Sequence, residues 1–177
     1  MDDGSGKSRP RGVTPAGLPH GTRVAVVVAR WNEAVTGGML AAARCTLAAA
    51  GLADDAVEVV WVPGSFELPL AADRLAATRR YAAILCLGAI IRGETTHDKH
   101  IATAVAGGIE QTARAWGLPV LFGVLTCDTA AQAAARSGGS AADDFAGNKG
   151  AECAAAALEM IAAVAAIGPP APAESPA

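Results

Sequence analysis

The chain has 177 residues, of which 52% are hydrophobic and 18% are charged, a composition typical of one globular domain with a sizeable core. Its net charge of −3 and its few aromatic residues (three Trp, three Phe and one Tyr) argue against nucleic-acid binding, because they provide neither a basic face nor a stacking platform. The chain starts without an apolar run, and Glu152 and Glu159 interrupt its longest alanine-rich stretch, so we expect no secretory signal and no membrane span.

The four cysteines show no metal-ligand or redox spacing, because no CxxC pair occurs among them. Each falls in an apolar strand or helix context, which is typical of small buried side chains in a reducing compartment. We therefore expect a cytoplasmic protein with buried thiols at Cys45, Cys86, Cys127 and Cys153.

Four apolar runs, rich in β-branched residues or leucine, alternate with helical patterns along the chain. These predicted strands span residues 23–29, 56–62, 81–90 and 119–126. The predicted helices are one that ends at Gly51, three over residues 66–77, 96–116 and 128–136, and a last one after Asn148. Because helices connect the strands, the pattern predicts an α/β fold with a four-stranded parallel sheet and helices on both faces.

Both ends of the chain are rich in glycine or proline. Residues 1–19 contain four Gly and three Pro, and residues 168–177 contain four Pro. Such segments bury too little apolar surface to become ordered alone, so we expect them to be disordered or to lie over a neighbouring molecule, with a single domain over residues 20–167. We place no site residue at either end.

Residues 88–97, Gly-Ala-Ile-Ile-Arg-Gly-Glu-Thr-Thr-His, lead from an apolar strand into a helix. Ligands of open α/β sheets bind at such carboxyl ends of strands. The amides around Gly93, Glu94 and Thr95 would lie at a helix N-terminus, where a phosphate or carboxylate is favoured. A histidine at position 97 adds a group suited to acid–base chemistry beside a bound anion. The alternative is that His97 only caps or packs.

Polar and aromatic residues also follow the first two predicted strands. Trp31 could stack on a planar ligand that Asn32 hydrogen-bonds; alternatively, Asn32 caps the next helix and Trp31 is its hydrophobic staple. Residues 63–67 offer backbone groups, an aromatic ring and the Glu67 carboxylate, which suit a polyol. The alternative is that Glu67 only complements a helix dipole. Phe122 lies within the fourth strand, where a core position is usual.

Two cations flank the junction between the last two predicted helices. Arg136 closes a short helix, where a cation favours the dipole, whereas Lys149 begins the last helix, where a cation is locally disfavoured. This unfavourable position of Lys149 indicates a function. His97 and His100 lack a third ligand at a metal-binding spacing, so we expect no metal site. No GxGxxG or Gly-Lys-Ser/Thr motif supports the use of a nucleoside triphosphate.

Five motifs, in their order and spacing, resemble the lumazine synthase family over about residues 20–165. They are Trp31-Asn32, Val62-Pro-Gly-Ser-Phe-Glu-Leu-Pro69, Gly88-Ala-Ile-Ile-Arg-Gly-Glu-Thr-Thr-His97, Pro119-Val-Leu-Phe-Gly-Val-Leu-Thr126 and Asn148-Lys-Gly150. The resemblance implies a flavodoxin-like three-layer sandwich and a transferase of the penultimate step of riboflavin biosynthesis. In that family 5-amino-6-(D-ribitylamino)uracil condenses with 3,4-dihydroxy-2-butanone 4-phosphate. The products are 6,7-dimethyl-8-ribityllumazine, phosphate and water, and neither a metal nor an organic cofactor takes part.

The resemblance also implies roles for individual residues, with His97 as the catalytic proton-transfer residue. The residues implied for the aminouracil are Trp31, Asn32, Ser65, Phe66, Glu67, Ala89, Ile90, Ile91 and Phe122. The family counterpart of Phe122 acts across a subunit boundary. The residues implied for the butanone phosphate are Glu94, Thr95, Arg136 and Lys149.

The chain departs from the family pattern at four places. Trp31 stands where phenylalanine is common, and His100 stands where an aromatic residue is common. Glu94 puts a carboxylate beside the expected phosphate site, so only its amide would contact the phosphate. The segment 136–148 is longer than in compact members of the family. This length favours a pentamer or a pair of pentamers over the sixty-subunit shell that some members form. The resemblance also allows riboflavin synthase as a partner.

Two other functions fit parts of the sequence. A catalytically weak relative could use the same pocket to carry a lumazine or riboflavin, or could serve as a shell protein. Such a protein would not need His97, Arg136 and Lys149 together. A flavodoxin-like domain with a different phosphorylated ligand would need only residues 88–97, and it would leave the aromatic residues and Glu67 unexplained.

Overall fold

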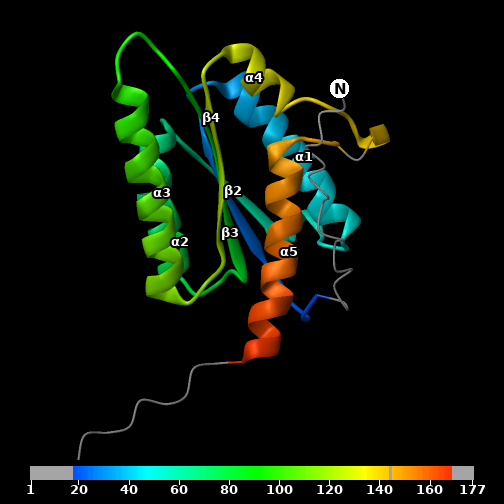
Figure 1. Cartoon of the computed structure of the whole chain (residues 1–177). Coiled ribbons are helices and arrows are strands. Elements are labelled where there is room, and N and C mark those ends of the chain that lie inside the picture. Colours follow the sequence, from blue (N-terminus) through cyan, green and yellow to red (C-terminus); the bar gives the residue numbers. More distant parts are fainter. Residues whose placement is uncertain (1–17, 144, 169–177) are drawn as a thin grey trace, which may run out of the picture.

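The computed structural model describes residues 18–143 and 145–168, and its centre is a parallel sheet of four strands (Figure 1). The strands are β1 (Val24–Ala29), β2 (Val57–Val62), β3 (Ala83–Ile91) and β4 (Val120–Cys127). Their order across the sheet is β2-β1-β3-β4, so β2 and β4 form its edges. All four predicted strands are confirmed, and their bounds differ from the predicted ones by at most two residues.

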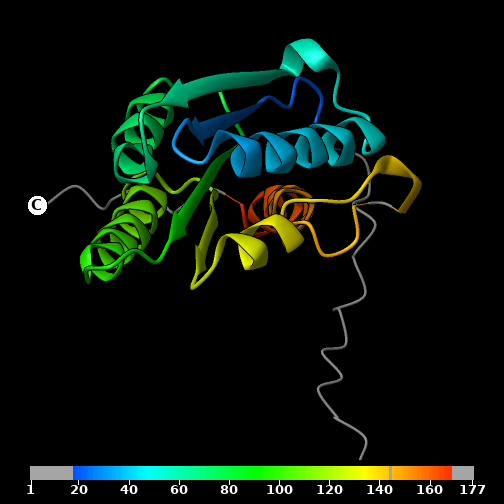
Figure 2. The same cartoon turned by 90° about the horizontal axis from the view of Figure 1, so that it is seen from above.

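Helices cover both faces of the sheet, which confirms the predicted three-layer α/β fold (Figure 2). The α-helices of the described residues are α1 (Glu33–Ala49), α2 (Leu68–Ala77), α3 (His97–Trp116), α4 (Ala130–Ala135) and α5 (Lys149–Ile167). Helices α1 and α5 pack on one face, and α2 and α3 pack on the other. Helix α4 is shorter than predicted, because its cap is Thr129, whose hydroxyl accepts a hydrogen bond from the Gln132 amide at 3.2 Å.

Strand β1 lies in the middle of the fold, and all six of its residues are buried. It has a hydrogen-bonded neighbour on each side and helices on each face, which is why it contains only valine and alanine. Its last residue, Ala29, pairs with Val62 at the end of β2, and Val28 pairs with Leu87 of β3. The segments that leave these three strands therefore begin at the same edge of the sheet.

Two glycines allow backbone to approach backbone on the face covered by α1 and α5. A Cβ on Gly150, the second residue of α5, would overlap the main chain of Met39 in α1. A Cβ on Gly38 would overlap the carbonyl group of Ser137, which follows α4. Because no larger residue fits at either position, these glycines hold the start of α5 and the end of α4 against α1.

The four cysteines are free thiols in different surroundings. Cys86 in β3 and Cys153 in α5 are buried, as predicted, and burial raises the pKa of both thiols, that of Cys153 to about 12. Cys127, at the end of β4, is half-buried. The prediction is wrong for Cys45, which is exposed because it lies off the buried stripe of α1.

Helix α5 is the one described helix that is long and apolar enough, by length and composition, to cross a membrane. Its apolar side chains pack against α1 and the sheet, where Ala154, Ala157, Leu158 and Ile161 belong to the buried core. This packing accounts for part of the apolar composition of the helix, whereas Met160 and Ile167 are exposed.

The predicted disordered ends, residues 1–19 and 168–177, lie outside the described residues except at positions 18, 19 and 168. Of these three, Leu18 packs against the core formed with α1 and α5.

Candidate active site

A hollow of about 900 Å³ opens at the carboxyl edge of the sheet, beside α2 and α3. Its walls are the segments that follow β1, β2 and β3 and the first turns of α3. The lining residues are Trp31, Asn32, Pro63, Gly64, Ser65, Phe66, Glu67, Ala89, Ile90, Ile91, Gly93, Thr95, His97, Asp98, His100, Ile101 and Ala104. The hollow therefore collects residues from all three strand ends that the sequence singles out.

The first wall is a tight corner after β1. The Trp31 amide donates to the Pro63 carbonyl at 3.0 Å, which joins this corner to the segment after β2. Asn32 has a left-handed backbone with φ of 64°, and its side-chain Nδ2 donates to the Ala89 carbonyl at 3.0 Å, which joins it to β3. The Trp31 side chain is 74% exposed and faces the hollow instead of serving as a hydrophobic staple. Asn32 occupies the N-cap position of α1, but its side chain does not cap the helix.

The second wall is the single turn Ser65–Glu67 after β2. Ser65 is buried, and it fits because residue 88 is a glycine. A Cβ added at Gly88 would lie 2.6 Å from the Ser65 hydroxyl oxygen. Glu67 accepts a hydrogen bond from the Gly64 amide on Oε2 at 2.9 Å, which fixes the turn. Phe66 is 60% exposed and lines the hollow. The turn thus presents a hydroxyl, an aromatic ring and a carboxylate together.

The third wall combines the end of β3 with the approach to α3. Ala89, Ile90 and Ile91 line the hollow, and Gly93 and Thr95 follow them along it. Helix α3 starts directly afterwards and is 20 residues long, so the positive end of its dipole lies beside this wall. In its first turn, the His97 amide donates to Thr95 Oγ1 at 3.4 Å and the Lys99 amide to the Thr96 carbonyl at 3.1 Å. The wall therefore offers apolar contacts first and an anion-favouring helix end next.

Glu94 is exposed and does not line the hollow, although Gly93 and Thr95 on either side of it do. A carboxylate outside the hollow weakens the repulsion that the sequence predicts between Glu94 and a phosphate. The Glu94 side chain is therefore no part of this wall.

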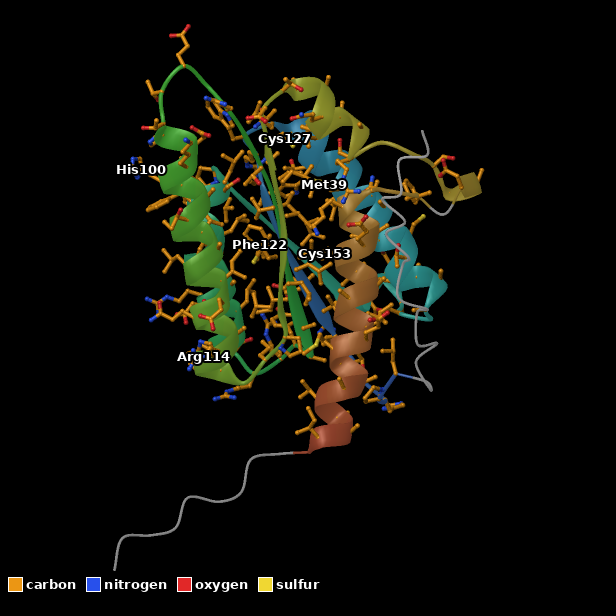
Figure 3. The ribbon with its side chains drawn as sticks, in the orientation of Figure 1. Met39, His100, Arg114, Phe122, Cys127 and Cys153 are labelled. Atoms are coloured by element: carbon orange, nitrogen blue, oxygen red, sulfur yellow. The ribbon has the colours of Figure 1, made fainter. Side chains whose placement is uncertain are left out.

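His97 is the first residue of α3, and its exposed side chain lines the hollow. The N-cap position of the helix belongs to Thr96, so His97 is not the capping residue. His100 lies one helical turn further along α3 and also lines the hollow (Figure 3). In the described part of the chain, no group of three or more His, Cys, Asp or Glu side chains could hold a metal ion.

Besides Glu94, three of the predicted site residues do not line the hollow of their own chain. Phe122 lies on the edge strand β4 and is 39% exposed (Figure 3). Arg136 follows the last residue of α4, and Lys149 begins α5, on the side of the sheet away from α2 and α3. Within one chain, these three residues therefore lie apart from Trp31, Phe66 and His97.

Arg136 and Lys149 are nevertheless close to each other, because both approach the same carboxylate oxygen. The Arg136 guanidinium lies 2.8 Å from Glu152 Oε2, and the Lys149 ammonium lies 3.7 Å from it. Glu152 is not among the site residues predicted from the sequence. The sequence feature that could have identified Glu152 is its i, i+3 spacing from Lys149, which places the two side chains on one side of α5.

The comparison with known families agrees with the fold. A profile of the 6,7-dimethyl-8-ribityllumazine synthase family matches residues 21–165. The chain belongs to this family. The matched range contains all four strands and the residues that line the hollow, so the resemblance inferred from the sequence motifs is confirmed.

Proposed function

We propose that this chain is a transferase that condenses 5-amino-6-(D-ribitylamino)uracil with 3,4-dihydroxy-2-butanone 4-phosphate to 6,7-dimethyl-8-ribityllumazine. Membership of the family supports the reaction class. The observation that carries the proposal is the meeting of Trp31, Glu67 and His97 in one hollow, although they follow three different strands. Trp31 can stack on a planar ring, Glu67 can accept hydrogen bonds from a polyol chain, and His97 can transfer a proton.

The aminouracil would lie between the corner after β1 and the end of β3. Trp31 is exposed and can stack on the pyrimidine ring, while Ile90 and Ile91 provide apolar contact. The ribityl hydroxyls would face the turn of Ser65 and Glu67, where one carboxylate oxygen is held by the Gly64 amide. Asn32 lines the same region, and its amide orientation is set by the bond to β3.

The butanone phosphate would lie at the start of α3. The amides around Thr95 and the positive end of the helix dipole favour its phosphate group. Arg136 offers a planar guanidinium that matches phosphate oxygens, and Lys149 adds a second positive charge. Since both cations lie away from the hollow of their own chain, we infer that they reach the hollow of a neighbouring copy. The edge strand β4 would bring Phe122 to the same boundary.

The active enzyme would then be a homo-oligomer, and the long segment 136–148 favours a pentamer or a pair of pentamers. This arrangement agrees with the separation of the two groups of site residues in one chain. The four free thiols support the cytoplasm as its location, since oxidised cysteines are typical of other compartments. Riboflavin synthase is the partner that would use the product.

His97 would move the protons that the condensation requires. Imine formation, loss of phosphate and ring closure each transfer a proton, and His97 is free of a capping role beside the anion site. A single positioned imidazole contributes about 10² to 10⁴ in rate. Holding both substrates together contributes through effective molarity, and it does not depend on His97.

The test is a turnover assay that follows lumazine absorbance against the uncatalysed condensation. We expect acceleration by the wild type and weaker acceleration by His97→Ala and Arg136→Ala. Arg114→Ala removes an exposed arginine at the far end of α3 and serves as a matched control with unchanged activity (Figure 3). No acceleration by the wild type, together with tight ribityllumazine binding, would instead indicate a carrier or shell protein. No binding would indicate a different phosphorylated ligand.

A further inference from the structure

Asn148 is buried at the base of the segment between α4 and α5, where it is 1% exposed. Both ends of its side-chain amide are hydrogen-bonded. Its Nδ2 donates to the Gly138 carbonyl at 2.8 Å, and its Oδ1 accepts from the Gly150 amide at 2.8 Å. The second bond caps α5, but the first reaches back to the start of the segment. Asn148 therefore connects the two ends of this segment.

Next to Asn148, a main-chain hydrogen bond joins the two residues that carry the cations of the proposed phosphate site. The Lys149 amide donates to the Arg136 carbonyl at 2.8 Å. Arg136 and Lys149 are thus neighbours through their backbones as well as through Glu152. We call these contacts of Arg136, Asn148 and Lys149 the neck of the segment.

The neck is fixed on α1 by close backbone contacts. Ser137, directly after Arg136, presses its carbonyl against Gly38. Gly150, directly after Lys149, lies against the main chain of Met39. Consecutive residues of α1 therefore support both sides of the neck, so the Asn148 amide joins two segments that are themselves held in place.

We propose that Asn148 is a positioning residue that sets Arg136 and Lys149 as one phosphate-binding pair. The inference rests on the proposed function of these two cations. Long side chains lose conformational entropy when they bind an anion. A neck whose backbone is already fixed avoids a further loss of backbone entropy on binding. The bond to Gly138 carries this role, whereas the bond to Gly150 serves the stability of α5.

Two variants separate the roles of the two bonds. Asn148→Ser keeps a capping hydroxyl for α5 but cannot reach the Gly138 carbonyl, and Asn148→Ala loses both bonds. We expect the KM for the butanone phosphate to rise about tenfold in both variants, the scale of one hydrogen bond, while the KM for the aminouracil stays within about twofold. The midpoint of thermal unfolding falls further in Asn148→Ala, because that variant also loses the cap of α5. Ala142→Ser, an exposed change in the same segment, should alter neither constant.

The inference is overturned if Asn148→Ser leaves both KM values unchanged, or if it raises both to the same extent. Arg136→Ala distinguishes failure of the inference from failure of the proposed function. If Arg136→Ala raises the KM for the butanone phosphate and Asn148→Ser does not, only the role of Asn148 falls. If Arg136→Ala also leaves this KM unchanged, the phosphate role of the pair falls with it.

Discussion

The two faces of the sheet are built in opposite ways. On the face of α1 and α5, glycines bring main chains into direct contact, and Met39 and Leu47 are fully buried. On the face of α2 and α3, the carboxyl edge opens into a hollow where Trp31 and Phe66 remain exposed. The first face is therefore closed by main-chain contacts, whereas the second combines a packed core, which includes Leu68 and Val105, with a hollow at its carboxyl edge. Substitutions at the main-chain contacts of the first face should affect stability, and substitutions in the hollow should affect substrate handling.

The largest effect is expected from Gly150→Ala on the closed face. The new methyl group would overlap the main chain of Met39, and α5 would have to move away from α1. Overpacking of this kind costs about 3 kcal/mol of unfolding free energy, which urea denaturation would measure. Gly107→Ala in α3 is the matched control, because nothing lies within 4 Å of its added Cβ. It should be neutral or slightly stabilising. An equal loss of unfolding free energy in both variants would contradict the contrast between the two faces.

His97→Ala should produce the next largest effect, and this effect should be confined to turnover. We expect kcat to fall about 10²-fold because a positioned proton-transfer group is lost. The urea midpoint should not change, since the His97 side chain is exposed. His20→Ala, at an exposed histidine outside the hollow, provides the control. A drop in stability without a drop in kcat would assign His97 to the scaffold.

Trp31→Ala should raise the KM for the aminouracil about tenfold, because a stacking partner contributes up to about 1.4 kcal/mol. Trp31→Phe should stay within about threefold of the wild type, since an aromatic face is retained. Steady-state kinetics with each substrate varied in turn would measure both. An equal effect of alanine and phenylalanine would show that ring stacking is not what Trp31 provides.

The smallest effect concerns pH and the buried thiol of Cys153. Burial raises its pKa from 9.0 to about 12, so the folded chain keeps its proton where the unfolded chain loses it. The stability that this thiol contributes is present below pH 9 and is lost as pH rises toward 12. Between pH 8 and 10 the wild type should lose about 1 kcal/mol more than Cys153→Ala. Parallel pH profiles of the two proteins in urea would contradict this assignment.

Much of the fold follows from the sequence because its signals are local. The valine and alanine run of β1 identifies a strand buried on both faces, and residues 88–97 place a strand, a glycine and a helix start in one stretch. Helix α1 shows the limit. Its many alanines make the apolar stripe weak, so the exposure of Cys45 could not be predicted.

The relation between distant site residues was also beyond the sequence. The motifs indicated Arg136 and Lys149 as site residues. Their contact through Glu152 and their separation from the hollow, however, depend on how α5 packs against α1. That packing depends on Gly38 and Gly150, and a glycine in a sequence does not reveal which main chain approaches it.

In the proposed enzyme, the cations of one copy complete the hollow of another. Co-expression of His97→Ala with Arg136→Ala tests it directly, because each chain lacks a different half of the site. In a head-to-tail ring assembled at random, about a quarter of the sites would regain both residues, and turnover should recover to about that fraction of wild type. Activity no higher than the average of the two variants alone would contradict the account and place both residues in one chain's site.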